Sequence, residues 1–207
     1  MIDVILFDFD GVILDSMHIR DKGFEYIFEK FPQHQVAELM KFHRSNGGLS
    51  RYVKIRYFFE EIRKESISND DVLKYATMFS EVMRAKLIDT SLLIMDSVNY
   101  IKQNYNKKKF HIVSGSDQNE LRFICEKLEL DKYFLSIHGS PTAKNELVST
   151  LLNEYKYVSS DTVLIGDSIN DYEAANNNGI DFIGYNNVEL INLGRAYLKD
   201  FSDKIIQ

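Results

Sequence analysis

Short apolar runs that end in polar or turn-forming residues recur along the chain. They are rich in Val, Ile, Leu and Phe, a composition typical of strands that are buried on both faces of a parallel sheet. We therefore expect strands at Val4–Phe9, Phe110–Val113, Leu135–Ile137, Thr162–Ile165 and Asp181–Gly184.

Apolar residues between the later runs follow the three- and four-residue spacing of amphipathic helices. Leu121, Ile124, Cys125 and Leu128 form one such stripe, and residues 147–155 hold another. Strands that alternate with helices indicate βαβ units, so the pattern predicts an α/β fold with a doubly wound, Rossmann-like parallel sheet. In such a sheet, reactive residues gather at the carboxyl ends of the strands.

The segment 17–93 shows helical stripes and almost no strand pattern. Apolar residues recur there at helical spacing, as in residues 24–31 and 72–83. A run of helices inserted after the first strand is typical of a separate lid. We therefore predict an α-helical cap at residues 17–93 and a core formed by residues 1–16 and 94–207.

Composition and charge exclude several classes of protein. Apolar residues make up 44% of the chain, enough for a packed core, so disorder is excluded as the overall state. The 25 Lys and Arg residues against 31 Asp and Glu give a formal net charge of −6, which disfavours nucleic acid as a partner. The single cysteine, Cys125, excludes an internal disulfide and a multi-cysteine zinc site.

Nothing in the sequence indicates a leader or a membrane span. The first residues lack a basic segment, and no apolar run reaches the roughly 20 residues that a membrane helix needs. We therefore expect a cytoplasmic protein with no membrane partner. The pattern leaves the oligomeric state open.

Candidate chemistry begins directly after the first predicted strand. Asp8 and Asp10 would lie on one side of the strand if the chain is still extended there. Two neighbouring carboxylates repel each other unless a metal ion or a lysine neutralises them. Gly11 would let the chain turn out of the sheet, although Asp and Gly also end strands as ordinary turn residues.

Three later segments carry matching chemistry. Ser114 and Gly115 end the second predicted strand, where a hydroxyl and backbone N–H groups can bind a phosphate-sized anion, although this is also ordinary loop composition. Lys144 stands where a helix is expected to begin, and the helix dipole disfavours a cation at that position. The side chain could point into the site, where it would neutralise carboxylates and bind phosphate. The alternative is an ordinary lysine on the surface. Asp167 and Asp171 follow another buried run and offer the oxygen ligands that Mg²⁺ prefers.

Taken together, these motifs resemble the haloacid dehalogenase superfamily, in its phosphatase and phosphomutase branch with a helical cap. Asp8-Phe9-Asp10-Gly11-Val12 is similar to the first motif of that family, and Ser114 to the second. Lys144 is similar to the third, and Gly166-Asp167-Ser168 with Asp171 to the fourth. The resemblance covers nearly the whole chain.

The resemblance implies a role for each core residue. Asp8 would be the nucleophile that forms an aspartyl-phosphate, and Asp10 the general acid and base. Ser114 and Lys144 would hold the phosphoryl oxygens. Mg²⁺ would be bound by Asp8, the backbone carbonyl of Asp10, and Asp167, with Asp171 in or near its ligand shell. We also assign Gly11 and Gly115 to the substrate-binding surface.

The predicted cap holds a basic stretch. Residues 41–59 contain five Lys or Arg residues and no acid, although a solvated helix face would look the same. Gly48-Leu49-Ser50-Arg51 resembles the cap loop of β-phosphoglucomutase-like members, which implies that Arg51 contacts an anionic group away from the reacting phosphate. Ser50 would cap the following helix. Arg20 stands where relatives usually have a histidine, and we assign it with Ser50 and Arg51 to substrate binding.

The motifs favour a Mg²⁺-dependent phosphatase of a small phosphorylated metabolite, of which a sugar phosphate is the leading case. The alternative is a phosphomutase of the β-phosphoglucomutase type, in which the phosphoryl group passes to a second hydroxyl. Asn145 follows Lys144, whereas the mutase branch often has proline there. A non-catalytic binding protein on this fold is disfavoured because Asp8 and Asp10 are both retained. Carbon–halogen hydrolysis is disfavoured by Asp10.

Overall fold

The central sheet is parallel and lies between two layers of helices. The computed structural model describes residues 2–206, and its six strands follow the order β3-β2-β1-β4-β5-β6. All the strand pairs are parallel, which confirms the predicted doubly wound α/β fold. The strands are β1 (Val4–Phe7), β2 (Lys109–Asp117), β3 (Ser136–Ser140), β4 (Thr162–Gly166), β5 (Asp181–Tyr185) and β6 (Ala196–Leu198).

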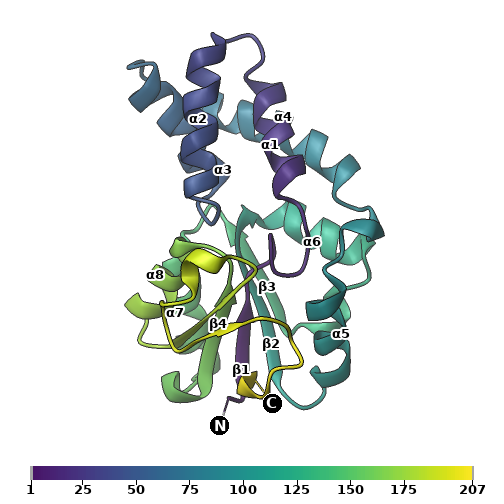
Figure 1. The fold of residues 1–207 in the computed structure, drawn as a ribbon. Helices are drawn as coiled ribbons and strands as arrows, with labels where there is room; N and C mark the ends of the chain where they lie inside the picture. Colours follow the sequence, from purple (N-terminus) through teal and green to yellow (C-terminus); the bar gives the residue numbers. More distant parts are fainter. Residues whose placement is uncertain (1, 207) are drawn as a thin grey trace.

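The alternation of side chains along β1 joins the sheet to both helical layers. Val4 and Leu6 pack in one apolar cluster with residues of α7 (Lys144–Tyr155) and α8 (Ile169–Asn177). Ile5 and Phe7 point the other way and pack in the cluster that includes α5 (Met95–Asn104) and α6 (Gln118–Lys127). Figure 1 shows these helix pairs on opposite sides of the sheet. β1 is buried on both faces because helices cover both.

Two strands differ from the prediction. β6 was not expected, because its three residues are Ala196, Tyr197 and Leu198, of which only Leu198 is buried. β2 continues to Asp117, beyond the predicted end at Val113, because a register irregularity between these two residues lets the pairing with β3 resume. Polar residues of the second motif are therefore part of a strand.

Four further helices form a separate group above the carboxyl ends of the strands (Figure 1). An aromatic core joins them: the ring centroids of Phe28 and Phe58 lie 4.2 Å apart, and those of Phe24 and Phe79 lie 4.5 Å apart. Among the described residues of 17–93 there is no strand, as predicted for a helical cap. The boundaries of the cap at residues 17 and 93 stay a prediction. The helices are α1 (Met17–Ile27), α2 (Gln33–Ser45), α3 (Arg51–Tyr57), continued by a π-helical turn (Phe58–Ile62), and α4 (Asn69–Lys86).

The remaining regular segments are single 3₁₀ turns, at Thr90–Leu92, Asp131–Tyr133, Ser159–Asp161, Val188–Leu190 and Lys204–Ile206.

Cys125, the single cysteine of the sequence, is buried in α6 and free. No helix within residues 2–206 combines the length and the apolar composition that crossing a membrane requires.

Candidate active site

The loop after β1 carries the first motif into the space below the cap. The backbone N–H of Asp8 donates to the carbonyl of Ile165 at 2.9 Å, which fixes the loop against β4. Gly11 has a φ of +78°, and a Cβ at this position would overlap the carboxylate of Asp167. Glycine is therefore required here, because it lets the loop turn and pass directly over Asp167.

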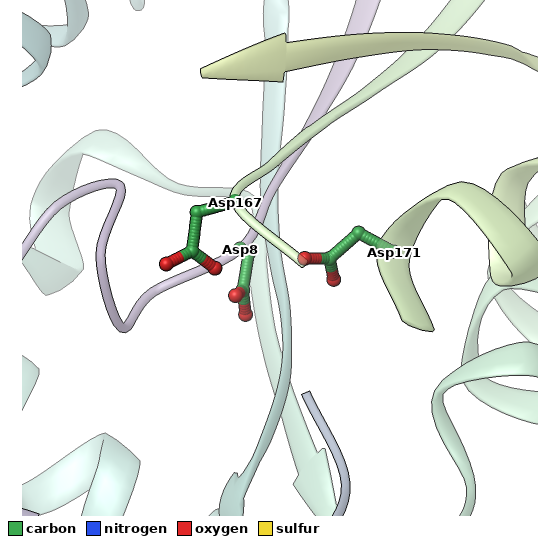
Figure 2. A group of neighbouring side chains, drawn as sticks. All are labelled: Asp8, Asp167 and Asp171. Atoms are coloured by element: carbon green, nitrogen blue, oxygen red, sulfur yellow. The ribbon is translucent and has the colours of Figure 1, made fainter. Parts of the chain in front are cut away.

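Three carboxylates from different segments meet at this point. Asp8, Asp167 and Asp171 each offer one oxygen atom, and these atoms lie within 4.8 Å of one another. In Figure 2, Asp171 extends from the beginning of α8 toward the carboxylates of Asp8 and Asp167. The sequence prediction placed these side chains in one metal site, and the fold brings them together.

Burial and mutual repulsion disfavour the charged forms of these carboxyls. Burial and the charge of Asp171 raise the pKa of Asp8 to about 7. Burial and the charge of Asp8 raise the pKa of Asp167 well above its ordinary value. Such a cluster is stabilised by a cation that the carboxylates can share.

Lys144 supplies one positive charge to the cluster. Its Nζ lies 2.8 Å from Oδ1 of Asp8 and also donates to Oδ1 of Asp171. Burial alone would lower the pKa of Lys144, but the carboxylates of Asp171 and Asp8 raise it overall. One lysine cannot balance three carboxylates, and the surplus of hard oxygen ligands fits Mg²⁺. The predicted lysine therefore does point into the site.

Asp171 is held by the helix that it begins. The backbone N–H and the Oγ of Ser168 both donate to Oδ2 of Asp171, at 3.0 and 2.6 Å. This capping box fixes the carboxylate at the N-terminus of α8 and leaves Oδ1 facing Lys144. The capping bonds and the ion pair with Lys144 thus use different oxygen atoms of Asp171.

Asp10 meets different neighbours from those of Asp8. Its carboxylate accepts from Nε of Arg20 at 2.7 Å, from Oγ of Ser116 at 2.5 Å and from Oγ of Ser16. Burial would raise the pKa of Asp10, but Arg20 and the two hydroxyls lower it overall. Asp8 therefore belongs to the acidic cluster, whereas Asp10 faces an arginine of the cap.

Ser114 and Gly115 lie near the carboxyl end of β2, two to three residues before its last residue, Asp117. Ser114 is buried and lines the same pocket as Asp8 and Asp10. A Cβ on Gly115 would overlap the backbone carbonyl of Gly48 in the cap. Gly115 is needed because the backbones of cap and core are in contact here. Contact of Gly115 with a substrate stays a prediction.

A buried acid that the sequence prediction missed holds the two arginines that were assigned to substrate binding, Arg20 and Arg51. Glu120 of α6 is 0% exposed and accepts from Arg51 at 2.7 and 2.6 Å and from Arg20 at 3.2 Å. Arg51 also donates to Oγ of Ser80 at 2.5 Å. The available signal was position, because Glu120 stands four residues before the buried Ile124 and thus on the apolar face of α6.

The other cap residue that the sequence selected, Ser50, has a structural role. Its Oγ accepts from the backbone N–H of Val53 at 3.3 Å, which caps α3 as predicted. Ser50 lines a neighbouring cavity, together with Lys144 and Gly115, and does not line the pocket above Asp8. Contact of Ser50 with a substrate stays a prediction.

The pocket between cap and core is small. About 30 Å³ is free for solvent, which is room for about two water molecules. A ligand larger than that needs more room than the pocket offers in this conformation. The residues that line the pocket from both sides include Asp8, Asp10, Arg20, Lys54, Ser114 and Asp167.

Two asparagines after β5 support the loops of the site and were not predicted. Nδ2 of Asn186 donates to the carbonyl of Gly11 at 3.0 Å, and Nδ2 of Asn187 donates to the carbonyl of Asp167 at 2.8 Å. These bonds tie the first and fourth motifs to one neighbouring loop. Nothing in the sequence pattern marks them, because asparagine is common in loops.

Comparison with known proteins agrees with this geometry. The model of the family described as "Haloacid dehalogenase-like hydrolase" matches residues 5–185. The chain belongs to the haloacid dehalogenase-like hydrolase family, which confirms the resemblance seen in the motifs. The family model describes hydrolases, so the chain is an enzyme of that family.

Individual relatives are distant in sequence. A phosphorylated carbohydrates phosphatase of Thermotoga maritima is 23% identical over 203 residues, covering 95% of this chain and 90% of the relative. β-Phosphoglucomutase from Clostridium difficile is 16% identical with a TM-score of 0.79, over 97% of this chain and 92% of that one. CbbY from Rhodobacter sphaeroides, solved with phosphate, is 16% identical with a TM-score of 0.78, over 98% and 96% of the two chains. At these identities the structures show a shared fold.

Proposed function

We propose that this enzyme is a Mg²⁺-dependent phosphatase that hydrolyses a small phosphorylated carbohydrate through an aspartyl-phosphate on Asp8. The observation that carries the proposal is the separation of the two motif carboxylates. Asp8 lies with Lys144 and the acidic cluster, while Asp10 lies apart beside Arg20. This separation supports Asp8 as the nucleophile and Asp10 as the proton carrier. The name of the Thermotoga maritima relative supports the substrate class.

In the first step, an oxygen of Asp8 attacks phosphorus as the ester P–O bond breaks. Lys144 lies against Asp8 and is positioned to hold a phosphoryl oxygen together with Ser114. Asp10 gives its proton to the leaving oxygen. In the second step, Asp10 takes a proton from water as that water attacks phosphorus, which releases Asp8 and inorganic phosphate.

The neighbours of Asp10 favour the second of these roles while the cap is closed. Arg20 and the hydroxyls of Ser16 and Ser116 keep the carboxylate ionised, which suits a base. To act first as an acid, Asp10 must take up a proton, and the contact with Arg20 opposes this. Because Arg20 belongs to the cap, movement of α1 away from the core removes that obstacle.

The metal ligands we propose are carboxylate oxygens of Asp8 and Asp167, with Asp171 beside them and the backbone carbonyl of Asp10 as a further ligand. When bound there, Mg²⁺ neutralises charge on the phosphoryl oxygens during transfer. Supporting this choice, the three carboxylates have only Lys144 as a cationic partner among residues 2–206.

Asp8→Asn tests the nucleophile. An amide oxygen is a poor nucleophile, so kcat with a sugar phosphate should fall by at least about 10⁴-fold. The fold should remain, because a neutral side chain relieves repulsion in the cluster. Steady-state phosphate release and the far-UV circular dichroism spectrum check both points. The matched control is Asp15→Asn, an exposed aspartate in the following turn; undiminished turnover in Asp8→Asn contradicts the assignment.

A phosphomutase of the β-phosphoglucomutase type is the second candidate, favoured by the Ser50–Arg51 loop. It differs in one product, which a coupled assay with a hexose 1-phosphate distinguishes. Free phosphate indicates the phosphatase, and a hexose 6-phosphate indicates the mutase.

Cytoplasmic location and the lack of a nucleic-acid or membrane partner stay predictions.

A further inference from the structure

The guanidinium of Arg51 is held on its edge and on its face by the protein itself. Its Nη1 and Nη2 donate to the two carboxylate oxygens of Glu120 at 2.7 and 2.6 Å, and Nη1 also donates to Oγ of Ser80. The ring of Phe79 lies against the guanidinium, with its centroid 4.6 Å from Cζ. A two-point contact of this kind is the strong form of an arginine–carboxylate pair. Both terminal nitrogens of Arg51 are therefore engaged before any substrate arrives.

Glu120 lies behind the two arginines that line the pocket, Arg20 and Arg51, and its side chain is 0% exposed. If Arg51 turned to a ligand, Glu120 would keep only Arg20, at 3.2 Å. Arg20 is itself shared with Asp10, whose carboxylate lines the same pocket. A buried charge that loses its partner is costly, and an acid added to the pocket would also face these carboxylates. Glu120 therefore opposes the binding of a further acid here.

Lys54 lies on the same side of the pocket and is surrounded by both signs of charge. Its Nζ donates to the backbone carbonyl of Gly47 at 3.1 Å. Burial, followed by the charge of Arg20, lowers the pKa of Lys54 to about 7, although Asp10 and Asp21 partly offset this shift. Near neutral pH the side chain is thus a hydrogen-bond donor that carries only part of a charge. Such a donor suits a hydroxyl group.

We propose that Glu120 is a specificity-determining residue, which makes this enzyme select phosphate monoesters whose organic part carries no second acidic group. It acts through Arg51, because its carboxylate already holds the guanidinium that an acidic substrate would need. The inference rests on the proposed phosphatase function and narrows its substrates to uncharged sugars and polyols with one phosphate. Phe24 and Leu49 offer such a chain an apolar surface, and Lys54 offers it a hydrogen-bond donor.

The test compares ligands in which a carboxylate replaces a single CH₂OH group. One pair is 3-phosphoglycerate and glycerol 3-phosphate, and the other is 6-phosphogluconate and sorbitol 6-phosphate. Binding is measured calorimetrically on Asp8→Asn protein with Mg²⁺, and kcat/KM on protein with Asp8 intact. The member without the carboxylate should be favoured by about 10- to 100-fold in both pairs, because like charges would otherwise meet in the pocket.

Glu120→Gln should release Arg51 and raise the affinity for the acidic member of at least one pair by about tenfold or more, with a smaller change for its partner. General damage to the fold would instead weaken the binding of both members. Adding Arg51→Gln to Glu120→Gln should abolish the gain, since the released guanidinium supplies it. Glu126→Gln, an exposed acid of the same helix, is the control that should leave the preference intact. Urea denaturation verifies that each variant is folded.

The double variant also tests the proposal if Glu120→Gln alone does not fold, because two amides then replace the ion pair without a change in net charge. It should bind both members of each pair as the unsubstituted protein does. Weaker binding of either member by the folded double variant would show that Arg51 acts on the substrate directly, which overturns the inference.

A preference of the unsubstituted protein for the acidic members overturns the inference, as does a lack of binding in both pairs. An unchanged preference in folded Glu120→Gln, or an equal loss on both members, also overturns it. Failure of the proposed function looks different: none of the esters is hydrolysed, while the binding preference on Asp8→Asn protein still depends on Glu120.

Discussion

Asp8 and Asp10 stand two positions apart yet differ in every neighbour that matters to their charge. Asp8 shares Lys144 with Asp171, whereas Asp10 accepts from two hydroxyls and from Arg20, which also donates to Glu120. The pKa of Asp8 is raised and that of Asp10 is lowered for these reasons. The opposite pKa shifts of two identical side chains therefore follow from their surroundings.

Asp167→Asn tests the metal site without reference to activity. A ligand that binds only the folded state stabilises it by about 2.7 kcal/mol at 100 times its Kd, and about 1 kcal/mol moves the Tm of a protein of this size by about 2–4 °C. Mg²⁺ should therefore raise the Tm of the unsubstituted protein by several degrees, and that of Asp167→Asn by much less.

The control for this experiment is Asp15→Asn, because Asp15 is exposed and lies outside the cluster. It should keep the full Mg²⁺-dependent shift. The same shift in Asp167→Asn, or none in the unsubstituted protein, contradicts the proposed ligand set.

Among the elements, α1 and α3 of the cap are joined to α6 of the core by one buried acid. Glu120 receives Arg20 from α1 and Arg51 from α3. Closer to the sheet, the loop before α3 touches the end of β2 where Gly48 meets Gly115. The position of the cap therefore depends on an ion-pair cluster and on a backbone contact.

Glu120→Gln should lower the free energy of unfolding by about 3 kcal/mol, because it leaves buried arginines without their countercharge. Urea denaturation measures the change. Glu126→Gln, an exposed acid two turns along the same helix, should change stability by less than about 0.5 kcal/mol. Equal stability of the two variants would show that the buried cluster contributes nothing.

Gly115→Ala should move the cap away from the core, since the new Cβ overlaps the carbonyl of Gly48. We expect kcat/KM to fall about 100-fold, as a misplacement of about 1 Å can cause. Kinetics and a melting curve separate this effect from unfolding. Gly47→Ala meets nothing closer than 3.8 Å and should have a smaller effect; the reverse order contradicts the proposed contact.

For the whole molecule, the sequence predicted the features that depend on residues close together in the chain. Buried strands, the helical segment 17–93 and the four motifs were all visible, because apolar periodicity and strand-end polar residues are local features. β6 was missed because its three residues carry little pattern. Pairing of strands then placed Asp8, Ser114 and Asp167 at one edge of the sheet.

The partners of buried charges were beyond the reach of local pattern. Lys54 and Arg56 belong to the same basic stretch, but Lys54 is buried in the pocket while Arg56 pairs on the surface with Glu60. Arg51 was assigned to substrate, and its neighbour Glu120 lies 69 positions away in sequence. Only the packing of the cap on the core decides which of these cations form an ion pair and with which acid.

The most direct test of the proposed mechanism is to trap the intermediate. The enzyme is mixed with Mg²⁺ and a phosphorylated sugar, quenched with acid within the first turnover, digested, and mapped by mass spectrometry. The proposed mechanism predicts one phosphoryl group on the peptide that carries Asp8, and none in Asp8→Asn. Turnover with Asp8 unmodified at every quench time, or a phosphoryl group on another residue, would contradict it.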